Sequence, residues 1–119
     1  MKLIIAIIRP ERLESVQQAL QSVLDEGDNY RLTAQPVEGH GRQHGETEYV
    51  RGKAVRARAV NRVEITIGVN DPYVGPAVDA IIRGARTGPD GEVGDGKIFV
   101  LPLEDCVRIR TGERGGTAI

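Results

Sequence analysis

Residues 1–24, MKLIIAIIRPERLESVQQALQSVL, contain the pattern that decides the fold. Residues 3–8 form an unbroken apolar run, which is typical of a buried central strand. Pro10 favours the first turn of a helix, where its missing N–H group would have no partner. Apolar residues then recur at spacings of three and four, which predicts one face of an amphipathic helix. These residues are Leu13, Val16, Leu20, Val23 and Leu24. We expect residues 27–29 to end the helix.

The same order of strand and helix returns between residues 63 and 85. Residues 63–69 alternate apolar with polar side chains, which predicts a half-buried strand. Asp71 and Pro72 then favour a helix start, with Asp71 as a candidate cap. The expected apolar face of this helix consists of Val74, Val78, Ile81, Ile82 and Ala85.

Three further segments complete the predicted fold. Residues 32–41 and 97–103 indicate strands, and residues 107–110 form a short alternating segment. The order is therefore β-α-β, a long loop, and β-α-β. Two such units predict a ferredoxin-like α+β sandwich (βαββαβ), with four antiparallel strands and both helices on one face. The other face stays bare, and association of several subunits would cover it.

Composition narrows the class of protein. The chain has 119 residues, enough for one domain, and a net charge of −1, which disfavours nucleic-acid binding. A single cysteine, Cys106, allows no intrachain disulfide. No apolar run approaches the ~20 residues that a membrane span needs. We therefore expect a cytoplasmic protein. Residues 42–61 are polar and locally basic, without periodicity, and loops of about this length are often functional.

Four short segments combine glycine or strand ends with cationic residues. Each has an ordinary explanation as a tight turn or as arginines paired with glutamate. Glycines let backbone N–H groups approach phosphate, and arginine or lysine adds positive charge. Taken together, the four segments indicate a cradle for a polyanion. They are Gly39–Gln43, Gly94–Lys97, Arg108 with Arg110, and Arg110–Gly115.

Several of these motifs, in this order, resemble the PII signal-transduction family over nearly the whole chain. The resemblance rests on residues 1–10, Gly41-Arg42-Gln43, Thr47-Glu48, Arg51-Gly52, residues 85–88, 94–100 and 107–115. It implies a homotrimer with sites for competing ATP and ADP between subunits, in a regulator of nitrogen metabolism and not an enzyme. The positions implied around the phosphates are Gly39, Gly41, Arg42, Gly94, Asp95, Gly96, Lys97, Arg108 and Arg110, with Thr33 beside the adenine.

The resemblance also implies an effector loop and further ligands. Residues 42–59 match the family's T-loop, which docks on a membrane transporter, by default an ammonium channel, or on a metabolic enzyme. Arg51 would be the partner contact. Gln43 would hold Mg²⁺ with ATP, and Gln43 and Arg62 would bind 2-oxoglutarate. The domain would span residues 1–119, with a tail at about 111–119.

The sequence departs from the family pattern at several places, which include His40 in place of a common phenylalanine and a longer loop at residues 88–94. Val55 and Lys53 stand where relatives carry a modifiable tyrosine or serine, so control by ligand alone is expected. Arg62 replaces a lysine near 2-oxoglutarate, and Thr66 replaces a glutamate. A guanidinium is a planar fork and an ammonium a point charge, so the two are not equivalent.

Alternative functions remain open at this point. One is a PII-like regulator of bicarbonate or cation transport. Another is a CutA-type metal-binding trimer, for which His40 and His44 are the only histidines. Phosphotransfer through a histidine and RNA binding through sheet aromatics are the remaining alternatives, and both lack the expected residues in suitable places.

Overall fold

The structure is a computed structural model, and it describes residues 1–24, 30–40, 48–50, 53–55 and 59–119. In chain order the elements are β1 (Lys2–Ile8), η1 (Pro10–Arg12), α1 (Leu13–Val23), β2 (Thr33–Gly39), β3 (Glu48–Val50), β4 (Lys53–Val55), β5 (Val60–Val69), α2 (Asp71–Ala85), β6 (Gly96–Pro102) and η3 (Gly115–Ala118).

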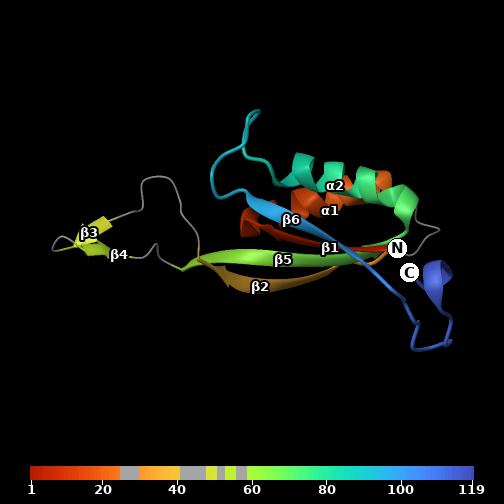
Figure 1. Cartoon of the computed structure of the whole chain (residues 1–119). Coiled ribbons are helices and arrows are strands. Elements are labelled where there is room, and N and C mark those ends of the chain that lie inside the picture. Colours follow the sequence, from red (N-terminus) through yellow and green to blue (C-terminus); the bar gives the residue numbers. More distant parts are fainter. Residues whose placement is uncertain (25–29, 41–47, 51–52, 56–58) are drawn as a thin grey trace.

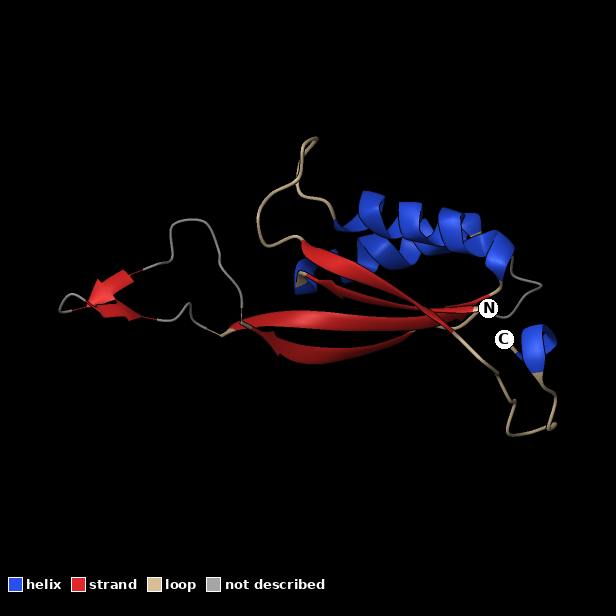
Figure 2. Ribbon diagram, viewed as in Figure 1, coloured by secondary structure: helices blue, strands red, loops and turns tan. Residues whose placement is uncertain are grey.

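Four of the strands form one antiparallel sheet in the order β2-β5-β1-β6. Helices α1 and α2 lie side by side on one face of this sheet (Figure 1, Figure 2). The predicted ferredoxin-like arrangement is therefore confirmed. The two central strands, β5 and β1, are those with the clearest apolar patterns in the sequence.

The core lies between this sheet and the helices. On β1 and β5 every second side chain is buried, because successive side chains of a strand point to opposite faces. The buried strand residues are Ile4, Ala6, Ile8, Ile65, Ile67 and Val69. Val16 and Leu20 meet them from α1, as the spacing of three and four predicts. The spacing of three and four therefore predicts the buried face of α1 correctly.

The buried face of α2 differs from the predicted one. Ile81 and Ala85 are buried as expected, but Ile82 is 37% exposed and Val74 and Val78 are only partly buried. The other fully buried residues of α2 are Ala77, Ala80 and Gly84. Small residues occupy this face because α2 packs closely against α1. An ideal Cβ on Gly84 would lie 2.7 Å from the Cα of Val16.

This close approach makes Gly84→Ala a test of the helix packing. We expect the substitution to lower the free energy of unfolding by about 1–3 kcal/mol, because the new methyl group meets backbone atoms that cannot move alone. Gly75→Ala is the matched control, since none of the described residues lies within 4 Å of an added Cβ at that position of α2. It should change the free energy of unfolding by less than about 1 kcal/mol, because the helix propensity of alanine is offset by the steric restriction that Pro76 places on the residue before it. Urea unfolding of both variants measures the difference, and equal midpoints would refute the close contact.

Neither α1 nor α2 covers the second face of the sheet, and among the described residues only the C-terminal segment lies against part of it. Leu3 and Ile5 of β1 lie opposite Leu101 and Phe99 of β6, respectively, so these four side chains share that face. Phe99 is 49% exposed and Leu101 40% exposed. The apolar open face that the sequence predicts is therefore present in the single chain.

Several predicted boundaries are wrong, and the alternating segment at residues 107–110 is not a strand. Helix α1 ends at Val23, before the predicted stop at residues 27–29, which lie outside the described residues. Asn70, not Asp71, occupies the cap position of α2, and the Asp71 carboxylate instead accepts a hydrogen bond from the Met1 ammonium group. Residues 107–110 form no strand, because only Val107 pairs, in a single bridge with Arg114.

The long segment between β2 and β5 also contains more order than the sequence pattern indicates. β3 and β4 pair with each other in a short antiparallel ladder that joins Glu48 to Val55. β5 already begins at Val60, so the predicted loop is wrong for its last residues as well. The predicted residues Gly41, Arg42, Gln43 and Arg51 lie outside the described part of the chain.

Candidate functional site

A groove of about 720 Å³ opens beside the C-terminal segment, and we call it the C-terminal groove. Strand residues of the open sheet face form one wall, and the segment after β6 forms the other. The lining residues are Leu3, Arg31, Thr33, Thr66, Gly68, Leu103, Asp105, Cys106, Arg108, Arg110, Ala118 and Ile119. Three arginines therefore share the groove with one acidic side chain, that of Asp105. Such a surplus of positive charge favours an anionic ligand.

Asp105 holds the C-terminal segment in place. Its carboxylate accepts hydrogen bonds from the backbone N–H of Cys106 at 2.8 Å and of Gly115 at 3.1 Å, and from Arg114 at 3.0 Å. The hydrogen bond from Cys106, with those from Arg114 and Gly115, lowers the pKa of Asp105 against the opposing effect of desolvation. Asp105 is thus engaged within its own segment, and the arginines of the groove keep their charge for other anions.

Arg108 and Arg110 both line the groove, but not for the reason that the sequence suggests. Strand alternation would place them on one face, whereas the structure has a turn at residues 109–111, with Ile109 fully exposed. Arg108 lies 3.5 Å from the Glu113 carboxylate and donates to the Thr117 carbonyl oxygen. Among the described residues, Arg110 makes no hydrogen bond or ion pair. The Arg110 guanidinium could therefore pair with a bound anion without breaking an interaction among the described residues.

Arg31 is a cation of this groove that the sequence analysis missed. It precedes Thr33 by two residues and lines the same cavity, and it has no hydrogen-bonding partner within the described part of the chain. A spacing of two on an extended segment places side chains on one side. That spacing from Thr33 is the signal that could have identified it.

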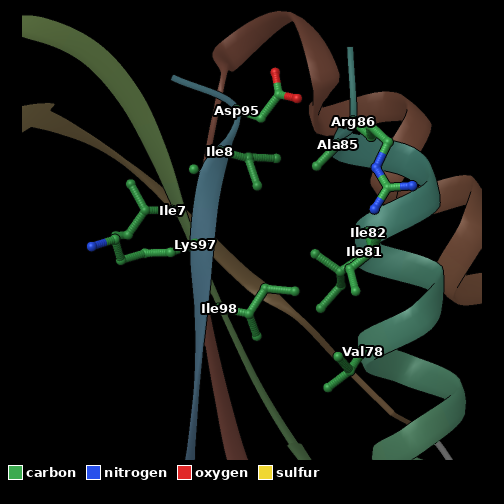
Figure 3. Close-up of a pocket in the computed structure, with 11 residues that line it drawn as sticks. Ile7, Ile8, Val78, Ile81, Ile82, Ala85, Arg86, Asp95, Lys97 and Ile98 are labelled. Carbon is green, nitrogen blue, oxygen red and sulfur yellow. The ribbon is translucent and has the colours of Figure 1, made fainter. Parts of the chain in front are cut away.

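A second groove, of about 340 Å³, lies between α2 and the start of β6, and we call it the α2–β6 groove (Figure 3). Ile81 and Ile98 face each other across it, and Asp95 lies at one end. The Lys97 side chain lies on the other side of β6, beside Ile7 (Figure 3). Lys97 and Ile7 are cross-strand partners, so the lysine belongs to the open face of the sheet.

The predicted Gly94-Asp95-Gly96-Lys97 turn leads into β6 at this place. Gly94 and Gly96 have φ angles of 97° and 111°, which favour glycine. The Asp95 carboxylate points back into the preceding loop. It accepts hydrogen bonds from the N–H and hydroxyl of Thr87, from the N–H of Glu92 and from Arg9. Burial alone would raise the pKa of Asp95, but these hydrogen bonds hold it well below its usual range.

The predicted nucleotide-binding residues thus fall into two groups on the single chain. Thr33, Arg108 and Arg110 line the C-terminal groove, whereas Asp95, Gly96 and Lys97 line the α2–β6 groove. The grooves share no lining residue. They lie at opposite ends of β1, since Leu3 lines the first and Ile8 the second.

The remaining predicted residues take defined places in the sheet. Gly39 pairs with Val60, near the end where Ile8 pairs with Gly96. Arg62 lies opposite Val37 and donates to the Asn61 carbonyl oxygen at 2.9 Å. Thr66 lies opposite Thr33, so both hydroxyl-bearing residues line the C-terminal groove.

Known proteins match this chain over its length. The family model described as "Nitrogen regulatory protein P-II" matches residues 1–113. The chain belongs to the PII family. This PII chain is 47% identical over 119 residues to "Nitrogen regulatory protein GlnK1" of Methanosarcina mazei, covering 97% of that protein. It is 44% identical to "Nitrogen regulatory protein P-II" of Azospirillum brasilense, with both chains covered completely.

A solved PII structure agrees with the fold. The crystal structure of Arabidopsis thaliana PII bound to citrate matches with a TM-score of 0.76 and 37% identity, over 99% of this chain and 91% of that one. The chain is accordingly a PII protein that regulates nitrogen metabolism. PII proteins bind small-molecule effectors and act through partner proteins, and they are regulators rather than enzymes.

In the described ranges, no group of three or more histidine, cysteine, aspartate or glutamate residues could hold a metal ion. The matches are to PII proteins and lend no support to the CutA-type alternative. Within the described part of this PII protein, neither helix has the length and apolar character that a membrane crossing requires.

Proposed function

We propose that this PII protein binds ATP and ADP in sites shared between neighbouring copies of a homotrimer in the cytoplasm. The observation that carries the proposal is where the two groups of predicted residues lie. Thr33, Arg108 and Arg110 line the groove near one end of β1, whereas Asp95, Gly96 and Lys97 line the groove near its other end. In a closed ring, the same two different surfaces meet at every interface. The C-terminal groove of one copy would then face the Gly94–Lys97 turn of the next. Burial of the apolar open face, with Leu3, Ile5 and Phe99, supports such an assembly.

Each group would supply a different part of the nucleotide site. Thr33 would lie beside the adenine, and Arg108 and Arg110 would pair with phosphate oxygens, since guanidinium groups bind them in a fixed fork. From the neighbouring copy, Gly96 would allow a close backbone approach, and Lys97 would add a point charge. Gly39, Gly41, Arg42 and Gly94 would complete the surroundings of the phosphates, and Asp95 would belong to the turn that approaches them.

The bound nucleotide would set the conformation of residues 42–59. This segment would dock, with Arg51 as a contact, on a membrane transporter such as an ammonium channel or on a metabolic enzyme. Gln43 would hold Mg²⁺ with ATP, and Gln43 and Arg62 would form the site for 2-oxoglutarate. A ligand shifts the segment only by the difference in its affinity for the two conformations.

Calorimetric titration tests the proposal. We expect ATP and ADP to compete for one site per chain, and AMP to bind more weakly because it brings fewer charges to the arginines. Titration of 2-oxoglutarate with and without Mg²⁺-ATP tests the further effectors. Hydrogen exchange across residues 42–59 should then differ between the apo, ADP-bound and ATP-bound states. Absence of nucleotide binding would refute the proposed nucleotide site. Identical exchange in all three states, despite nucleotide binding, would refute the proposed effect of the nucleotide on residues 42–59.

A further inference from the structure

The Asp95 carboxylate joins the two ends of the loop before β6. The N–H of Thr87 donates to one carboxylate oxygen at 3.0 Å, and the Thr87 hydroxyl donates to the other at 2.6 Å. The N–H of Glu92 donates at 2.8 Å. The Asp95 side chain is 18% exposed, so these bonds form largely away from water. Asp95 is therefore engaged by its own loop and is poorly placed to contact a nucleotide.

Arg9 connects this loop to the sheet. It follows β1 directly, and its Nε donates to Asp95 at 3.2 Å while its Nη2 donates to the Val93 carbonyl oxygen at 3.1 Å. Glu92 lies 3.8 Å from the same guanidinium. Arg9 is distant from all of these residues in the sequence, yet it holds the second half of the loop against the end of β1.

The loop has little else to fix its shape. Gly88, Gly91 and Gly94 all adopt positive φ angles. Between Thr87 and Asp95 the structure gives one backbone hydrogen bond, from the Asp95 N–H to the Glu92 carbonyl oxygen. Glycines have many alternative conformations and lose more entropy on folding than other residues. The conformation of residues 88–95 thus depends on the bonds that converge on Asp95.

We propose that Arg9 and Thr87 are positioning residues for the phosphates. They act through Asp95, which holds the turn at residues 94–97 in the shape that presents backbone N–H groups and Lys97 to a nucleotide. This inference rests on the proposed function. The depressed pKa of Asp95 agrees with it, because the carboxylate stays ionised throughout the neutral range.

The effect of Asp95→Asn on nucleotide affinity distinguishes a carboxylate that positions the loop from one that contacts the phosphates, because the two roles predict changes in opposite directions. A carboxylate that touched the phosphates would repel them, so Asp95→Asn would then tighten nucleotide binding. A carboxylate that holds the loop has the opposite effect, because the amide loses charge-assisted hydrogen bonds. We expect Asp95→Asn to weaken ADP binding about ten-fold, in line with the usual strength of hydrogen bonds to charged groups. Tighter binding by this variant would overturn the inference.

Variants of the two positioning residues complete the experiment. ADP affinity should fall about ten-fold in Arg9→Gln and in Thr87→Val, and Thr87→Ser should restore it, since serine keeps the donating hydroxyl. Arg83→Gln is the matched control, because Arg83 is an exposed cation in the last turn of α2 that the site does not use. It should stay within about two-fold of wild type, which separates positioning from a general loss of positive charge.

Amide exchange and the unfolding midpoint show whether the positioning role or the proposed function is wrong. In nucleotide-free protein, the Glu92 and Asp95 amides should exchange faster in Arg9→Gln and Thr87→Val than in wild type, with the global unfolding midpoint close to that of Thr87→Ser. If wild type binds no nucleotide, the proposed function fails and this inference fails with it. If wild type binds but Arg9→Gln and Thr87→Val bind equally well, only the positioning role is wrong.

Discussion

Gly96→Ala should destabilise the protein more than any other single substitution considered for this chain. An ideal Cβ on Gly96 would lie 1.7 Å from the carbonyl oxygen of Ile7, a distance at which the two atoms overlap. The φ angle of 111° adds strain for any residue with a side chain. Because β1 and β6 are paired there, the clash can be relieved only by separating the strands. We expect a loss of about 4 kcal/mol or more, which is a large part of the stability of an ordinary domain.

Gly88→Ala is the matched control for this effect. Gly88 lies in the loop that leads into β6 and also has a positive φ angle, 66°, but no described residue lies within 4 Å of an added Cβ. Its substitution should cost only about 1–2 kcal/mol, the price of a left-handed conformation. Denaturant unfolding of both variants measures the comparison. Similar midpoints for the two alanine variants would contradict the close approach between Gly96 and β1.

Lys97→Ala and Arg108→Ala should each weaken nucleotide binding strongly. Both residues are assigned to phosphates, and a hydrogen bond to a charged group contributes about 1.5–3 kcal/mol. That range corresponds to a loss of about 10- to 150-fold in affinity for ATP or ADP. Lys97 is exposed, and Arg108 makes only long contacts to Glu113 and Thr117, so neither substitution should disturb the fold. Titration calorimetry measures the affinities, and unchanged affinity in both variants would remove the site.

The strands and helices of the sheet layer could be predicted from the sequence, because their signals are local and repeated. Alternation on β5 and the spacing of three and four on α1 each involve five or more residues. The spacing of three and four between large apolar residues did not predict the buried face of α2, where Ala77, Ala80 and Gly84 are buried. A search for large apolar residues overlooks small ones, yet small residues allow two helices to approach closely.

The C-terminal segment shows where alternation misleads. The order Val107-Arg108-Ile109-Arg110 has the period of a strand, but Ile109 is fully exposed and the chain turns there. A strand requires a hydrogen-bonded neighbour, and only Val107 has one, in the bridge to Arg114. Pairing is set by residues elsewhere in the chain, so the local pattern could not reveal its absence.

The sequence names candidate site residues, but it does not indicate that they lie in separate places on one chain. The sequence identified Thr33, Lys97 and Arg108, and the structure separates them into two grooves. The sequence also does not indicate the contacts of Asp95, because the residues that Asp95 contacts lie up to 86 positions away in the chain. A glycine-rich turn shows that a backbone can approach a ligand, but not which side chains hold that backbone in place.

Mixed trimers of Lys97→Ala and Arg108→Ala subunits test the shared site most directly. Each variant alone lacks one of the two groups at every interface. If the site joins Lys97 of one copy to Arg108 of its neighbour, co-expression of the two variants should restore wild-type affinity at about one site in four under random assembly. Calorimetry on the purified mixture measures that fraction. A mixture that binds ADP no better than the two variants do separately would contradict a nucleotide site between copies.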